Sequence, residues 1–218
     1  MSDPIQVLVV DDHFIVRKGV CALLVGVEGI VVAGEAGDGE QAVAAARRLR
    51  PDVILMDLRL PGLDGLAAIR AILAERPETA ILLLTVMDRE EVVLAAIRAG
   101  ALGYLPKSSP QEDFVEAIRR VAQGGTWLPA QLARRLATFP ALPAEPTALT
   151  GREREVLEML ARGWSNRRIS EELSIAEITV RTHVSHLLGK LGVRNRVEAA
   201  LHVVRSGTGS LQSPDPWL

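Results

Sequence analysis

Three carboxylates, one hydroxyl and one ammonium in the first half of the chain follow short runs of mostly apolar residues. These groups belong to Asp11, Asp12, Asp57, Thr85 and Lys107. Carboxylates that lie close together repel one another and need a cation between them. A cluster of oxygen ligands with room for water suits Mg²⁺, which prefers octahedral oxygen coordination. If the chain brings these side chains together, the residue types indicate a magnesium site beside a lysine.

A carboxylate beside Mg²⁺ and a lysine is arranged to hold a phosphoryl group. The metal and the ammonium neutralise the phosphoryl oxygens, while a carboxylate oxygen attacks the phosphorus in line. Asp57 follows the apolar run 53–56 and is the candidate nucleophile, and Thr85 can donate a hydrogen bond to a phosphoryl oxygen. The product would be an aspartyl phosphate. Taken alone, Asp57 could instead cap the helix that follows it, because Asp is a common N-cap.

Apolar periodicity predicts five strands that alternate with five helices in the first half. The strands are expected at 5–10, 30–36, 53–57, 79–85 and 103–106, and the helices at 13–25, 40–49, 64–75, 89–99 and 110–122. This alternation indicates a doubly wound α/β fold, in which helices cover both faces of a five-stranded parallel sheet. Right-handed crossovers bring the carboxyl ends of such strands to one edge, where these folds bind ligands.

The composition describes an ordinary globular protein whose two halves differ in charge. The chain has 218 residues, of which 48% are hydrophobic and 24% charged, which suggests one or two domains. Residues 1–123 carry 13 Lys and Arg against 18 Asp and Glu, a net charge of −5, whereas residues 124–218 carry 12 against 9, a net of +3. The basic second half indicates contact with a polyanion.

Cysteine content and hydropathy limit the class of protein further. Cys21 is the single cysteine of the sequence, so an internal disulfide and a zinc site made of several cysteines are excluded. The sequence has no basic leader before an apolar core, and its apolar runs fall short of the roughly 18 residues of a membrane span. We therefore expect a cytoplasmic protein that has no membrane partner.

A stretch with three prolines in seven positions, 140–146, separates the two halves. Such a stretch is extended and is typical of a linker. We expect a first domain at 1–123, a linker with a short helix at 124–147, and a smaller all-α domain at 148–205. The remainder, 206–218, is rich in Ser, Gly and Pro and is expected to be a disordered tail.

The second domain has the pattern of four helices, with a helix-turn-helix at its centre. Thr150 and Glu153 can form a capping box at the start of the first helix. The third helix, expected at 178–191, carries an apolar stripe on one face and small or polar residues on the other. The stripe consists of Val180, Val184, Leu187, Leu188 and Leu191, and the opposite face of Arg181, Thr182, Ser185 and Gly189. A recognition helix has this form, but a solvated face of a four-helix bundle would also fit.

The first half resembles the receiver domain of bacterial response regulators. The shared motifs are Asp11-Asp12, Asp57 in Met-Asp-Leu-Arg-Leu-Pro-Gly-Leu-Asp-Gly, Thr85, and Tyr104-Leu-Pro-Lys107. The resemblance covers about residues 5–122 and implies a flavodoxin-like fold with Asp57 as the phosphorylated residue. It implies that Mg²⁺ is bound by Asp11, Asp12, Asp57 and the main-chain carbonyl of Arg59. It also implies that Lys107 contacts the phosphoryl group and that Thr85 and Tyr104 form a conformational switch.

The second half resembles the LuxR-type DNA-binding domain over about residues 148–205. The shared motifs are Leu149-Thr-Gly-Arg-Glu-Arg-Glu-Val-Leu157, Gly163-Trp-Ser-Asn166 and Thr179-Val-Arg-Thr-His-Val-Ser185. The resemblance implies base contacts from Arg181, Thr182 and Ser185, and phosphate contacts from Arg167, Arg168, His186, Lys190 and Arg194. The chain departs from the family pattern at Ala176, where a Ser, Thr or Asp usually caps the recognition helix.

Together the two resemblances imply a NarL/FixJ-type response regulator. Such a protein is a transcription factor that receives its phosphoryl group from a sensor histidine kinase and binds double-stranded DNA as a homodimer when phosphorylated. No turnover of an external substrate is expected. One alternative is a phosphatase working through the same aspartyl phosphate, which needs a second Asp where Arg59 stands. The other is a regulator that binds DNA whether or not it is phosphorylated.

Overall fold

The structure is a computed structural model that describes residues 3–85, 89–139 and 149–206. Contacts within the chain divide it into two compact units, Met1–Ala122 and Gln123–Leu218. The proline-rich segment and all but the first residue of the predicted tail lie outside the described residues.

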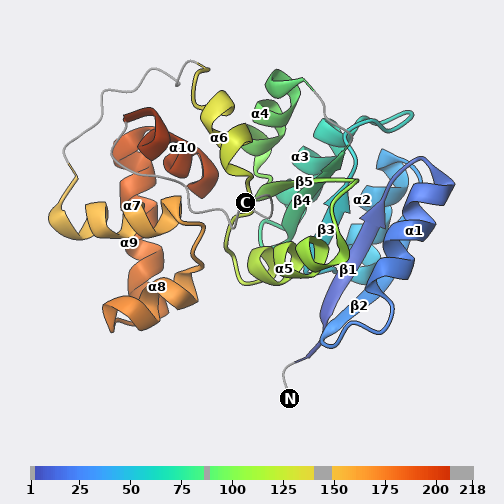
Figure 1. Ribbon diagram of the computed structural model, residues 1–218, viewed down its shortest axis with the longest axis horizontal. Helices are drawn as coiled ribbons and strands as arrows, with labels where there is room; N and C mark the ends of the chain where they lie inside the picture. The colour runs from blue at the N-terminus through green and yellow to red at the C-terminus, as the bar shows by residue number, and fades with distance from the viewer. Residues whose placement is uncertain (1–2, 86–88, 140–148, 207–218) are drawn as a thin grey trace. The chain divides into compact units, whose positions relative to one another are not determined.

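The first unit consists of five parallel strands that alternate with five helices (Figure 1). The strands are β1 (Ile5–Val10), β2 (Ile30–Ala36), β3 (Val53–Met56), β4 (Ala80–Thr85) and β5 (Gly103–Pro106). The helices are α1 (Phe14–Leu24), α2 (Gly39–Leu49), α3 (Gly65–Glu75), α4 (Glu90–Ala99) and α5 (Gln111–Ala122). The strand order is β2-β1-β3-β4-β5. The predicted fold is confirmed, and the predicted bounds differ from the observed ones by at most one residue; β3, for example, ends at Met56 and not at Asp57.

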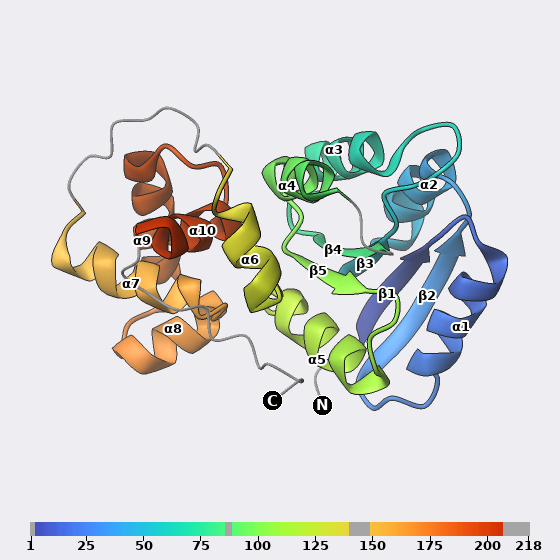
Figure 2. The same cartoon turned by 45° about the horizontal axis from the view of Figure 1, so that its top comes forward.

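The central strands lack apolar–polar alternation because both of their faces are covered. All four residues of β3 are fully buried, and so are 7–10 of β1 and 81–84 of β4. Helices α1 and α5 cover one face of the sheet, and α2, α3 and α4 cover the other (Figure 2). Strands buried on both faces read as continuous apolar runs, as parallel sheets generally do. This architecture leaves the carboxyl edge of the sheet as the place where polar side chains meet.

The second unit is helical. It contains α6 (Ala130–Leu136), α7 (Gly151–Ala161), α8 (Asn166–Leu173), α9 (Glu177–Leu191) and α10 (Arg196–Ser206). Helices α7 to α10 share a core made of Val156, Leu157, Leu160, Ala161, Ile169, Val180, Leu187, Leu191, Ala199, Ala200 and Val203. The apolar stripe predicted on α9 faces this core, because three of its members are buried and the other two pack against it. The helix-turn-helix is formed by α8 and α9.

The helix caps predicted from the sequence at the start of α7 and α8 are present in the second unit. Thr150 and Glu153 form the predicted capping box at the start of α7. The side chain of Ser165 accepts a hydrogen bond from the backbone N–H of Arg168 at the start of α8. Ala176 occupies the N-cap position of α9 and offers no side-chain hydrogen bond. Helix α9 therefore begins without the side-chain cap that α7 and α8 possess.

The segment that follows α5 is hydrogen-bonded to the helical unit. The backbone N–H of Thr126 donates to the carbonyl of Gly163 over 3.3 Å, and Nε of Arg205 donates to the carbonyl of Ala137 over 3.0 Å. The short helix predicted within the linker is present as α6 and contacts α10. Residues 124–139 of the expected linker thus pack as part of the second unit.

Candidate functional site

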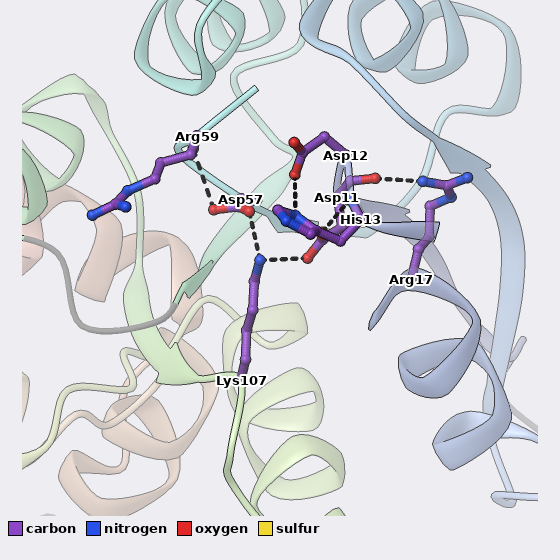
Figure 3. A network of polar contacts seen from close by, with 7 residues as sticks. All are labelled: Asp11, Asp12, His13, Arg17, Asp57, Arg59 and Lys107. Atoms are coloured by element: carbon purple, nitrogen blue, oxygen red, sulfur yellow. Dashed lines mark hydrogen bonds and ion pairs between the residues drawn. The ribbon is translucent and has the colours of Figure 1, made fainter. Parts of the chain in front are cut away.

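Four strand ends bring the predicted polar residues together at the carboxyl edge of the sheet. Asp11 follows β1 and Asp57 follows the adjacent β3, with the backbone N–H of Asp57 donating to the carbonyl of Val10 over 3.0 Å. Thr85 is the last residue of β4, and Lys107 follows β5. Figure 3 shows the side chains of Asp11, Asp57 and Lys107 pointing toward one another.

Lys107 bridges the two buried carboxylates. Its Nζ lies 2.5 Å from Oδ2 of Asp57 and 2.6 Å from Oδ2 of Asp11. Asp11 is fully buried, and Asp57 is 2% exposed. Burial raises the pKa of Asp57, although the nearby Lys107 ammonium acts in the opposite direction. Burial disfavours the charge on Lys107, but hydrogen bonds to Asp11 and Asp57 outweigh it and raise the Lys107 pKa. The ammonium therefore stays charged beside the carboxylates.

The donor set of this pocket fits a hard divalent cation. Two buried carboxylates share a single ammonium, and the exposed Asp12 adds a third carboxylate beside Asp11. The excess negative charge needs a cation, and oxygen ligands with one side open to water are the coordination that Mg²⁺ prefers. Asp11 and Asp12, with the neighbouring His13, form a cluster in which one ligand atom from each residue lies within 4.8 Å of the others.

The side chain of Asp57 accepts a hydrogen bond from the loop that follows it. The Arg59 N–H donates to Oδ1 of Asp57 over 3.2 Å, and the Arg59 side chain is exposed and extends away from the pocket (Figure 3). The cap of α3 is Asp64, whose Oδ1 accepts the Ala67 N–H over 2.7 Å. The alternative interpretation of Asp57 as the cap of this helix is therefore wrong.

Gly65 and Arg17 support the pocket, although neither residue was predicted to do so from the sequence. A Cβ atom on Gly65 would lie 2.4 Å from the carbonyl oxygen of Asp57, so α3 approaches the phosphoacceptor candidate as closely as a glycine allows. Arg17 reaches back from α1, and its Nη1 donates to the carbonyl oxygen of Asp11 over 2.5 Å. The sequence feature that could have indicated the close approach of Gly65 to Asp57 is the Asp64-Gly65 pair, which follows a Pro-Gly turn.

Thr85 and Tyr104 lie on adjacent strands next to the pocket. Both are buried, with 1% and 5% of their surface exposed. The register places Thr85 opposite Pro106, and the backbone N–H of Lys107 donates to the carbonyl of Thr85 over 3.3 Å. One backbone hydrogen bond therefore joins Thr85 to the residue that contacts Asp57.

The face of α9 opposite the core is exposed. Arg181, Thr182 and Ser185 all lie on this face, and Arg181 forms an ion pair with Glu177 over 2.8 Å. The groups predicted to contact phosphates differ in their surroundings. Arg167, Arg168, His186 and Arg194 are exposed, and the guanidinium of Arg168 stacks over the Trp164 ring at 4.3 Å. Lys190 is half-buried and forms an ion pair with Glu153 over 2.7 Å.

No helix in the described part of the chain has both the length and the apolar character needed to cross a membrane.

Two family models match the chain, one in each unit. Residues 7–119 match the model described as "Response regulator receiver domain", and residues 147–203 match "Bacterial regulatory proteins, luxR family". The protein is therefore a two-component response regulator, and the chain belongs to the family that joins a receiver domain to a LuxR-family DNA-binding domain. This family consists of transcription regulators, not of enzymes that turn over an external substrate.

Relatives match over nearly the whole chain. The nitrate/nitrite response regulator protein NarP of Escherichia coli is 43% identical, and the match covers 92% of this chain and 94% of that protein. The transcriptional regulatory protein LiaR of Bacillus subtilis is 40% identical over 93% of this chain and 98% of its own. A solved structure of two RcsB dimers bound to two parallel DNAs aligns with a TM-score of 0.57 at 25% identity, covering 94% of this chain and 99% of that one.

Proposed function

We propose that phosphorylation of Asp57 switches this transcription regulator, and that its C-terminal unit then binds double-stranded DNA as a homodimer. The observation that carries the proposal is the contact of Lys107 with both Asp57 and Asp11 at the open edge of the sheet. An ammonium held 2.5 Å from the candidate nucleophile is in position to contact a phosphoryl oxygen once the carboxylate is esterified. The proposed domains are 1–123 and 148–205, and the proposed location is the cytoplasm.

The phosphoryl donor is a phosphohistidine of a sensor kinase. A carboxylate oxygen of Asp57 forms a bond to the phosphorus while the bond between phosphorus and the histidine nitrogen breaks. Asp11, Asp12, Asp57 and the main-chain carbonyl of Arg59 would hold Mg²⁺, which supplies charge neutralisation for the phosphoryl oxygens when bound. Lys107 contributes the second positive charge and remains protonated beside the product.

Thr85 and Tyr104 couple this reaction to the rest of the receiver. The Thr85 hydroxyl donates to a phosphoryl oxygen, and the Tyr104 ring on the adjacent strand adjusts its position behind it. Phosphorylation thereby shifts the population between two arrangements of the receiver surface. The favoured arrangement pairs two chains, so that two copies of α9 reach half-sites about one DNA turn apart.

In the DNA complex, residues of the second unit make two kinds of contact. Arg181, Thr182 and Ser185 contact base edges in the major groove, while phosphate contacts come from Arg167, Arg168, His186, Lys190 and Arg194. Exposure of the first three on the face of α9 opposite the core supports this assignment. The matching RcsB structure contains dimers bound to DNA, which supports the proposed dimer.

Phosphorylation of the full chain tests the site directly. Incubation with acetyl phosphate and Mg²⁺ should add one phosphoryl group, detected by intact-protein mass spectrometry and lost on treatment with hydroxylamine, which cleaves acyl phosphates. Asp57→Asn should take up none, whereas Asp52→Asn, at an exposed aspartate before β3, should react like the unaltered chain. Uptake by Asp57→Asn would contradict the assignment of the phosphoacceptor.

A further inference from the structure

His13 stands beside the acidic pocket, and its imidazole contacts one of the pocket carboxylates. Its Nδ1 lies 2.6 Å from Oδ1 of Asp12 and 3.7 Å from Oδ1 of Asp11. Figure 3 shows the ring of His13 next to both aspartates. The side chain is 69% exposed, so it can turn without disturbing the core. A nitrogen donor therefore adjoins a pocket that otherwise offers oxygen ligands.

The backbone of His13 is held in place while its ring takes no part in helix capping. The His13 N–H donates to Oδ1 of Asp11 over 2.9 Å, and its carbonyl accepts the N–H of Arg17 over 3.0 Å. His13 is the N-cap residue of α1, yet its side chain forms no capping hydrogen bond. The ring is thus held at the edge of the pocket by its backbone and by the 2.6 Å hydrogen bond between Nδ1 and Oδ1 of Asp12.

The spacing of the ligand atoms fits one shared ion. One ligand atom from each of Asp11, Asp12 and His13 can be chosen so that all three lie within 4.8 Å of one another. Ligands about 2.1 Å from a common first-row ion are about 3.0–3.4 Å apart in octahedral or tetrahedral geometry. The separations of Nδ1 from Oδ1 of Asp12 and from Oδ1 of Asp11, 2.6 Å and 3.7 Å, bracket this range. A small rotation of the exposed His13 ring would bring Nδ1 within coordination distance of an ion that Asp11 and Asp12 hold.

We propose that His13 is a further ligand of the divalent-cation site and makes this site favour ions that accept nitrogen. The inference rests on the proposed cation site at Asp11 and Asp12. Imidazole suits Zn²⁺ and other late first-row ions, whereas Mg²⁺ prefers oxygen and keeps its waters. His13 therefore adds affinity for Co²⁺ and Zn²⁺ and leaves affinity for Mg²⁺ nearly unchanged.

Metal titration of the full, chelator-treated chain tests the inference without measuring phosphorylation. Isothermal titration calorimetry at about pH 7.5 gives the dissociation constants for Mg²⁺ and Co²⁺. The visible spectrum of bound Co²⁺ reports whether a nitrogen ligand is present. His13→Ala should weaken Co²⁺ binding by about tenfold or more and alter this spectrum. The same variant should change the Mg²⁺ dissociation constant by less than about twofold.

A control histidine and a control aspartate separate the possible outcomes. His202→Ala, in α10 of the other unit, should leave the Co²⁺ constant and spectrum unchanged. Unchanged Co²⁺ binding in His13→Ala would overturn the inference. Equal weakening of Co²⁺ and Mg²⁺ would also overturn it, because the ring would then only position Asp12. If the unaltered chain and Asp12→Ala bind Mg²⁺ equally weakly, the proposed cation site itself fails.

Discussion

The carboxylate of Glu153 and the ammonium of Lys190 lie 2.7 Å apart and connect the first turn of α7 to the last turn of α9. The same Oε2 accepts hydrogen bonds from the backbone N–H and the hydroxyl of Thr150. Glu153 therefore completes a helix cap and holds the C-terminal end of the recognition helix. Lys190 was predicted from the sequence to contact a DNA phosphate. In the structure it is paired with Glu153, so a phosphate contact would require Lys190 to share or give up this ion pair.

This arrangement predicts how the stability of the second unit depends on pH. The hydrogen bonds from Lys190 and Thr150 lower the pKa of Glu153 from 4.5 to about 2. A carboxyl whose pKa is lower in the folded state stabilises the fold above its unfolded pKa and loses that contribution as the pH falls through its folded pKa. Denaturant unfolding should show the advantage of the unaltered chain over Glu153→Gln shrinking between about pH 4.5 and pH 2. A constant difference across this window would contradict the contact.

Gly65→Ala should damage the receiver through backbone overlap. The added Cβ would lie 2.4 Å from the Asp57 carbonyl oxygen and 2.6 Å from Cα of Leu58, so one backbone segment must move. We expect a loss of about 1–3 kcal/mol in the free energy of unfolding, together with slower phosphorylation of Asp57. Chemical denaturation of the full chain, followed by a signal from the first unit, measures the loss.

Gly19→Ala provides the matched control for this prediction. A Cβ at Gly19 meets nothing within 4 Å, and the residue lies inside α1 on its exposed side. Alanine is the better helix former, so this change should stabilise the receiver by about 0.5–1 kcal/mol. If Gly65→Ala and Gly19→Ala have the same free energy of unfolding, the close approach of α3 to Asp57 does not require a glycine at position 65.

Ala176→Ser should stabilise the second unit by supplying the missing cap of α9. Ala176 has φ −64° and ψ 144°, the extended conformation from which a serine hydroxyl can accept a backbone N–H of the first turn. The expected gain is about 1 kcal/mol, seen as a higher melting temperature of the helical unit. An unchanged or lower melting temperature would count against Ala176 as the start of the helix.

Two arginines should affect DNA binding in different ways. Arg181 lies on the exposed face of α9, whereas Arg168 lies on α8 with its guanidinium over Trp164. Arg181→Ala should reduce discrimination between operator and unrelated DNA, while Arg168→Ala should weaken binding to both roughly equally. Fluorescence anisotropy at matched salt measures each dissociation constant. Equal losses of discrimination from the two variants would refute the division into base and phosphate contacts.

The position of the site could be predicted because it depends on topology. Asp11, Asp57 and Lys107 follow apolar strands, and right-handed crossovers leave one edge where strand ends can meet. The contacts of Arg17 with the Asp11 carbonyl and of Lys190 with Glu153 depend on the rotamers of long side chains that reach another segment of the fold. Apolar periodicity reports which face of a helix is buried and carries no information on such pairs.

The packing of the segment after α5 could not be predicted from the sequence. Glycines and prolines predicted a linker from 124 onward, yet the backbone of Thr126 and the carbonyl of Ala137 are hydrogen-bonded to the helical unit. Local composition indicates where the chain can turn. It does not indicate which later helix will supply a partner such as Arg205.

The most direct test of the account is the DNA affinity of the full chain with and without beryllofluoride and Mg²⁺, a mimic of the aspartyl phosphate. Measured at one salt concentration on operator DNA, the unaltered chain should bind more tightly when the mimic is present, and Asp57→Asn should not respond. Equal affinity of the unaltered chain in both conditions would contradict the proposed coupling between Asp57 and the recognition helix.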